Sequence, residues 1–369
     1  MTEQLYIRER LISIDVLRGF AMFLILAMDI GGAPIFETFA GLFGEDFAKA
    51  AIKQTSYGFT TELRLCFIAM PMFLFVVGLA IPFSMNKRLE KNGRKRIYLH
   101  IVKRSVILFI LGLIAGGHLL SLKFENMYVY NNVLEYISIG YLVCAILVLN
   151  TSLTFQFLLT VGLLVVYWAI FLFIPVPGGD GEIFSGTMNL AIYIDDVVLG
   201  THHRHGSWQV LATISFIANM LAGVVIGQII SSRKEEHKTK KLFIYGFIMI
   251  LTGLIWAQVF PVIRSLWTSS FVLVTVGIST LLLALFYFII DVKGYSRWAF
   301  FFIVFGANSI AIYMMAHLFD FRLIGNIFIG GFSNLFDAGG QAFIQAIGAM
   351  TIMWLIMYWM YIKKTFIKI

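Results

Sequence analysis

The sequence contains few charged residues. Asp, Glu, Lys and Arg make up 13% of its 369 residues, whereas 60% are hydrophobic. A soluble protein of this size carries about twice that charged fraction. Apolar runs of roughly 18 or more residues recur along the chain, which is typical of membrane-spanning helices. These features exclude an ordinary soluble protein and predict an all-α polytopic integral membrane protein.

Cysteine is also scarce. The two cysteines, Cys66 and Cys144, each lie within an apolar run, so they are too few for a disulfide framework and lack metal-ligand spacing. The segment Thr201–His205, THHRH, has three histidines but no carboxylate or cysteine at ligand spacing. We therefore predict no metal. Linkers, low-complexity tracts and internal repeats are lacking too, so we expect one multi-span membrane domain over residues 1–369.

Hydropathy predicts about ten transmembrane helices, separated by two long outer loops at about 35–62 and 175–207 and by a basic cytoplasmic loop at about 86–104. The predicted spans cover residues 16–34, 63–85, 104–121, 132–150, 154–174, 208–231, 241–261, 268–290, 297–318 and 340–361.

The distribution of positive charge predicts the orientation. Of the 28 Lys and Arg residues, 21 fall on the side that carries both termini and 7 on the other side. Because cytoplasmic loops of membrane proteins are enriched in Lys and Arg, we expect both termini to be cytoplasmic. This bias explains the net charge of +8 without a nucleic-acid partner. The expected partner is the lipid bilayer, and the expected location is the cell (inner or plasma) membrane.

Several polar residues lie within the predicted spans or at their outer ends, where ionisable groups are costly and mark functional sites. They are Asp29, Glu62, Arg64, His118, Glu135, Asn308 and His317. In the predicted topology all of them except Asn308 fall toward the outer side. A carboxylate and a histidine facing one wet cavity can deprotonate an alcohol or amine, and Asn or Arg can stabilise charge on a carbonyl oxygen. The same residue types form proton relays in transporters.

The basic loop contains the run NKRLEKNGRKR from Asn86 to Arg96. It is either a solvated turn facing anionic lipid headgroups or a landing patch for a phosphate-rich cofactor. In the second interpretation the phosphate-binding residues are Lys87, Arg88, Arg94 and Arg96.

Six segments together resemble the polytopic transmembrane acyltransferases related to heparan-α-glucosaminide N-acetyltransferase. They occur in the family order across nearly the whole chain. The segments are Arg10–Ile25, Met70–Met85, His100–Gly117, Val133–Leu142, Asn189–Gly200 and Gly306–Leu318. The first carries the family's first-helix signature, which includes Arg10, Asp15 and Arg18.

The resemblance implies that acyl-CoA binds from the cytoplasmic side and that the acyl group passes to an amino or hydroxyl group of a sugar on the outer side. Asp29, His118, His317 and Glu135 are then the candidate catalytic residues. The candidate substrate-binding residues are Asn308, Arg64 and Glu62.

The chain departs from the family before its second span. The family has a histidine there, followed by an aspartate ahead of a proline, but Lys53–Pro71 contains no histidine and has Phe67 at the aspartate position. Two other functions therefore stay open: a proton-coupled transporter or flippase for a sugar or lipid-linked glycan, and a non-catalytic membrane partner protein. A homodimer is also possible.

Overall fold

The computed structural model describes residues 11–28, 33–116, 118–177, 183–186, 188–202, 209–232 and 237–366, with the backbone alone for 86–92 and 126. Every regular element in these ranges is helical. The main helices are α1 (Ile12–Ala27), α2 (Ile35–Gly41), α3 (Glu45–Thr55), α4 (Cys66–Ala115), α5 (Val133–Asn150), α6 (Leu153–Phe173), α7 (Leu190–Val198), α8 (Thr213–Ser231), α9 (Lys238–Trp256), α10 (Ser269–Phe286), α11 (Phe300–Ala307), α12 (Ser309–Leu318), α13 (Phe321–Ser333) and α14 (Ala338–Ile362). Six short helical turns join them: η1 (Leu119–Ser121), η2 (Phe124–Asn126), η3 (Gly200–His202), η4 (Val210–Ala212), η5 (Tyr287–Val292) and η6 (Arg297–Ala299).

The polytopic, all-α prediction is confirmed. Among the described residues, eight helical segments are long and apolar enough to cross a membrane, and a bent pair of helices makes a ninth. The remaining prediction, the first span at 16–34, corresponds to α1, which has 16 helical residues and ends at Ala27; residues 29–32 lie outside the described ranges.

The predicted loop at 86–104 is helical instead. α4 runs through it, and the chain turns back at a single residue, Gly93, whose φ of 70° and ψ of 158° interrupt the helix. Lys, Arg, Glu and Leu are strong helix formers, so a charged segment between two spans keeps its helical conformation until glycine permits the break. The third span therefore starts at Gly93 rather than at residue 104.

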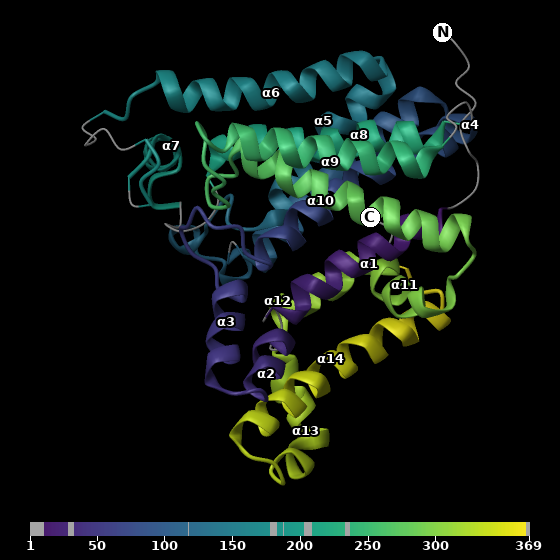
Figure 1. The fold of residues 1–369 in the computed structure, drawn as a ribbon. Coiled ribbons are helices and arrows are strands. Elements are labelled where there is room, and N and C mark those ends of the chain that lie inside the picture. Colours follow the sequence, from purple (N-terminus) through teal and green to yellow (C-terminus); the bar gives the residue numbers. More distant parts are fainter. Residues whose placement is uncertain are drawn as a thin grey trace.

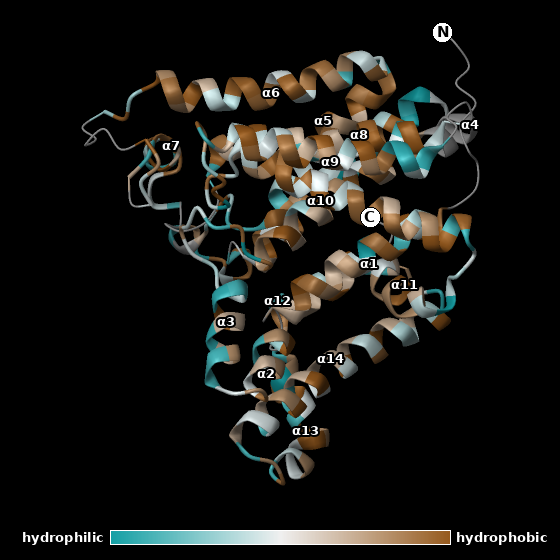
Figure 2. Ribbon diagram, in the orientation of Figure 1, coloured by the Kyte–Doolittle hydropathy of each residue, from teal (hydrophilic) through white to brown (hydrophobic). Residues whose placement is uncertain are grey.

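The helices form two groups (Figure 1). One group contains α4, α5, α6, α8, α9 and α10, and the other contains α1, α11, α12, α13 and α14. α1 is buried along most of its length and contacts both α4 and α11, so it joins the two groups. Helices α6 and α9 expose large apolar side chains and are hydrophobic along much of their length (Figure 2), as expected for lipid-facing helices.

Two contacts fix the position of α1. Gly19 lies against the backbone of α11, because a Cβ there would approach the Phe302 carbonyl oxygen to 1.7 Å. Small residues allow such close approach between membrane helices. The Asp291 carboxylate, in the π-helical turn η5, accepts hydrogen bonds of 3.1 Å from the backbone N–H groups of Ile12 and Ser13. It caps the first turn of α1, which otherwise has unsatisfied donors.

Candidate functional site

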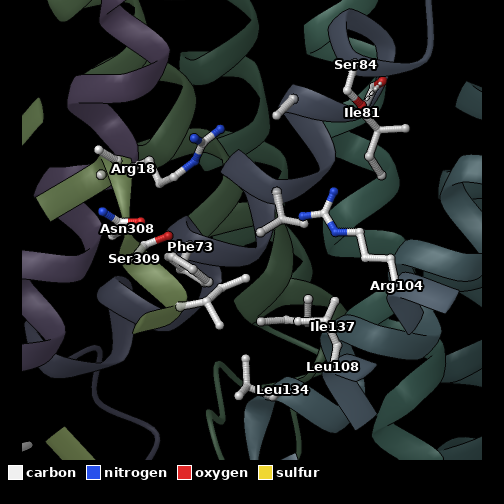
Figure 3. A pocket seen from close by; sticks show the side chains of 15 residues that line it. Arg18, Phe73, Ile81, Ser84, Arg104, Leu108, Leu134, Ile137, Asn308 and Ser309 are labelled. Carbon is white, nitrogen blue, oxygen red and sulfur yellow. Dashed lines mark hydrogen bonds between the residues drawn. The ribbon is translucent and has the colours of Figure 1, made fainter. Parts of the chain in front are cut away.

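A cavity of about 280 Å³ lies between the two helix groups. Its walls come from α1, both arms of α4, α5 and the junction of α11 with α12. Ten of its fifteen lining residues are apolar, and polar side chains stand on opposite walls, as in small-molecule sites (Figure 3). The polar lining residues are Arg18, Ser84, Arg104, Asn308 and Ser309.

Two guanidinium groups enter this cavity from opposite walls (Figure 3). Arg18 projects from α1 and lies 3.5 Å from Asp15, one turn earlier. Arg104 projects from the second arm of α4, and its guanidinium carbon lies 4.3 Å from the Tyr141 ring centre. The buried Nε of Arg104 has no hydrogen-bond partner among the described residues. The cavity therefore carries two positive charges on opposite walls, a setting that attracts an anion.

The cavity wall also includes a broken span. α11 and α12 are bent by 63° at Asn308, which is buried and donates a 3.2 Å hydrogen bond to the Thr365 carbonyl oxygen. Irregular backbone at membrane depth is tolerated where it is buried or lines a cavity. The break starts a new helix at Ser309, whose first N–H groups carry partial positive charge. This half-helix begins at the same cavity that contains Arg18.

α12 leads from the cavity to a second group of polar residues. Its Tyr313 hydroxyl donates a 3.3 Å hydrogen bond to Asn132, whose near neighbour Leu134 lines the cavity. His317 lies one turn beyond Tyr313, with ring centres 4.3 Å apart. From the cavity residue Ile310 to His317 the helix rises by about 10 Å. The cavity and this second polar group are thus neighbours along one helix.

The hydrogen bond of His317 defines its tautomer. Its Nδ1 lies 2.9 Å from the Tyr313 carbonyl oxygen, which can only accept, so Nδ1 carries the proton. In the neutral ring the lone pair is then on Nε2, which is the form that a general base requires.

Other predicted residues have local structural contacts. Glu135 is fully buried, and its carboxylate accepts from the backbone N–H groups of Tyr130, at 2.5 Å, and Asn132, at 3.2 Å, in a capping box that starts α5. Glu62 is exposed and pairs with Lys53 at 3.0 Å.

Arg64 and Arg264 lie near each other at the start of α4. Arg64 donates to the Ser56 carbonyl oxygen at 2.9 Å, and Arg264 lies over the Tyr57 ring at 4.5 Å. Both guanidinium groups also face the Phe67 ring, at 5.9 and 5.5 Å. Burial lowers the pKa of Arg264. Tyr57, Phe67 and the two arginines therefore form an aromatic and cationic cluster just before and within the first turn of α4.

The remaining predicted residues lie apart from the cavity or outside the described ranges. His118 is exposed in a left-handed conformation and packs edge-on against Tyr128 at 5.7 Å. Arg94 and Arg96 are exposed beside the turn of α4. Arg10, Asp29 and the side chains of Lys87 and Arg88 lie outside the described residues.

Sequence reasoning missed Arg104 and Tyr313. Arg104 is at the end of the predicted basic loop 86–104 and belongs to the 21 cations predicted on the side of the termini. A helical repeat through Ile97, Ile101, Arg104 and Leu108 nevertheless places it on the buried face.

Fold and cavity together define the class: a polytopic, all-α membrane protein with a cationic internal cavity. Comparison with known sequences identifies related proteins. A family model described as a domain of unknown function (DUF5009) matches residues 10–123. Heparan-alpha-glucosaminide N-acetyltransferase of Mus musculus is 26% identical over 426 aligned positions, covering 98% of this chain and 60% of the mouse protein. The Homo sapiens protein is 27% identical over 421 positions, with the same coverage.

The chain is a distant relative of these N-acetyltransferases, which confirms the resemblance predicted from its segments. It spans about 60% of the length of the curated relatives that it matches.

Proposed function

We propose that this chain is a membrane acyltransferase. It takes an acyl group such as acetyl from an acyl-CoA donor and transfers it to an amino or hydroxyl group of a sugar or glycan on the outer side of the cell (inner or plasma) membrane. The observation that carries the proposal is the cavity with two opposed arginines next to the helix that carries His317. The activity named for the relatives supports it.

In this proposal the cavity holds the anionic donor. Arg18 and Arg104 bind phosphate oxygens, since guanidinium groups recognise phosphate through paired N–H donors. The start of α12 at Ser309 adds positive potential on the same wall. The exposed Arg94 and Arg96 assist the approach of the donor from the cytoplasm.

His317 is the proposed general base. Its Nε2 accepts the proton of the acceptor amine or hydroxyl while that group attacks the thioester carbonyl carbon. The carbon–sulfur bond then breaks, an amide or ester forms, and the proton passes to the leaving CoA thiolate. Asn308 lies in the cavity wall, and in this proposal its amide orients the acyl group. The transfer needs no metal.

The experiment is acyl transfer by the purified protein. Incubation with radiolabelled acetyl-CoA and a panel of amino sugars should give labelled sugar with wild type and none with His317→Gln. His237→Gln, an exposed histidine at the start of α9, is the matched control and should keep activity. No transfer together with no CoA binding by calorimetry would refute the proposal.

A second candidate function is a proton-coupled transporter or flippase for a sugar or lipid-linked glycan. The broken span at Asn308 favours it, because discontinuous helices form the substrate sites of many transporters. Uptake of labelled sugar into proteoliposomes, driven by a pH gradient and independent of acetyl-CoA, would support this function over the acyltransferase.

A further inference from the structure

α13 (Phe321–Ser333) has a large apolar face that no other described element covers. Its exposed large side chains recur on one side of the helix and of the turn that follows it. They are Leu323, Ile327, Phe328, Phe332 and Leu335. Ile327 is 79% exposed and Phe328 is 76% exposed, which is far more than a soluble protein shows for a cluster of this kind.

The opposite side of α13 is packed on α14. A Cβ on Gly325 would lie 3.1 Å from the Ala349 backbone nitrogen, and the Ile329 side chain lies against Gly348. This contact fixes the rotation of α13. The exposed apolar face therefore points away from the protein.

The connections of α13 keep it at the membrane. Two residues, 319 and 320, link it to the end of α12, and four residues, 334 to 337, link it to the start of α14. Both neighbours belong to candidate spans. With 13 residues, α13 is about 20 Å long, which is too short to cross a hydrocarbon core of about 30 Å.

The charged residues of this region lie mostly on α3 and not on α13. Arg322 is the only charged residue of α13 and lies in its first turn, where a long side chain can extend to the lipid headgroups. α3, which packs on α2, carries an exposed ion pair of Lys49 with Glu45 at 3.4 Å. Figure 1 shows α2, α3 and α13 together at one end of the molecule, apart from α6 to α10.

We propose that α13 lies in the plane of the bilayer, at its predicted outer surface, with the Leu323–Leu335 face in the boundary between headgroups and acyl chains. Interfacial helices bury an apolar face in this boundary, and in α13 the side opposite that face packs on α14 instead of facing water. The proposal concerns lipid contact alone, so it does not depend on the proposed acyltransferase activity.

The test places a fluorescent probe on each face. In a background of Cys66→Ala and Cys144→Ala, the variant Ile327→Cys is labelled with the environment-sensitive dye NBD. Lys49→Cys, on α3, is the matched control, and Leu323→Cys is a second position on the apolar face. Each protein is reconstituted in phosphatidylcholine vesicles, with and without phosphatidylcholine that carries a doxyl quencher near the headgroup end of its acyl chain.

We expect blue-shifted emission and severalfold stronger doxyl quenching at Ile327→Cys and Leu323→Cys than at Lys49→Cys. Emission at both α13 positions like that of the control would overturn the proposal, because the face would be in water. Blue-shifted emission without doxyl quenching would overturn it as well. Loss of the blue shift when the protein is diluted in lipid would also overturn the proposal, because a second copy of the chain would then cover the face.

Discussion

Replacing Arg104 by Gln tests the proposed donor site most sharply. The guanidinium lies over Tyr141 at 4.3 Å and its Nε has no hydrogen-bond partner among the described residues. Packing on Tyr141 therefore holds Arg104 in place, and its guanidinium group lines the cavity. Gln removes the charge and the paired donors while leaving a polar side chain that fits the same space.

The expected magnitude follows from the bonds lost. A hydrogen bond to a charged group contributes about 1.5–3 kcal/mol. Since 1.4 kcal/mol is a factor of ten in affinity, Arg104→Gln should raise the Kd for acetyl-CoA by about 10- to 150-fold. Arg104→Lys keeps the charge but loses the planar fork and the stacking on Tyr141, so its Kd should lie between those of wild type and Gln.

The assay is titration calorimetry with acetyl-CoA in detergent, paired with thermal unfolding to show that each variant is folded. Lys103→Gln is the matched control, because it removes one positive charge from the adjacent, exposed residue. Its Kd should stay within about twofold of wild type, as expected for a screened surface charge. An unchanged Kd for a folded Arg104→Gln variant, or an equal loss in both variants, would refute the assignment of Arg104 to the donor site.

His317→Gln should lower kcat by about 10²–10⁴-fold with an unchanged Kd for acetyl-CoA, and full turnover would remove His317 from the mechanism. Gly19→Ala forces a Cβ to within 1.7 Å of the Phe302 carbonyl oxygen and should destabilise the protein by about 1–3 kcal/mol or more in thermal unfolding. Gly162→Ala, with open space around it, should be neutral or stabilising. Burial raises the pKa of Asp195 from 3.8 to about 7, so its contribution to stability is present below about pH 4 and is lost as the pH rises through 7. Asp195→Asn should therefore match wild type near pH 4 and unfold at a higher temperature at pH 8, and equal melting temperatures at both pH values would contradict this.

The spans were predictable because hydropathy is a local property. Each of the ten predicted spans has a helix in the structure, with ends shifted by a few residues in most cases. The turn at Gly93 was not predictable, since the surrounding charged residues suit both helix and loop. One glycine with a positive φ makes the turn where the sequence predicts a loop.

The site was less predictable, because a side chain's role depends on helix rotation and on neighbours distant in sequence. Glu135 suggested a cavity carboxylate, but the spacing from Asn132 to Glu135 is also that of a capping box, and the structure has that cap. The charge pattern predicts Arg104 as one of the cytoplasmic cations, whereas the structure places it in the cavity wall. Asn308 was singled out from the sequence, and it lies at the break that forms the cavity wall.

Transfer across the membrane is the central claim, and sided proteoliposomes test it most directly. Radiolabelled acetyl-CoA is supplied on the face that carries Arg94 and Arg96, and an amino sugar is confined to the opposite face. The account predicts labelled, acetylated sugar on the sugar's own side, with its formation lost in His317→Gln. Movement of unmodified sugar across the bilayer, or product formed only when both substrates share one side, would contradict it.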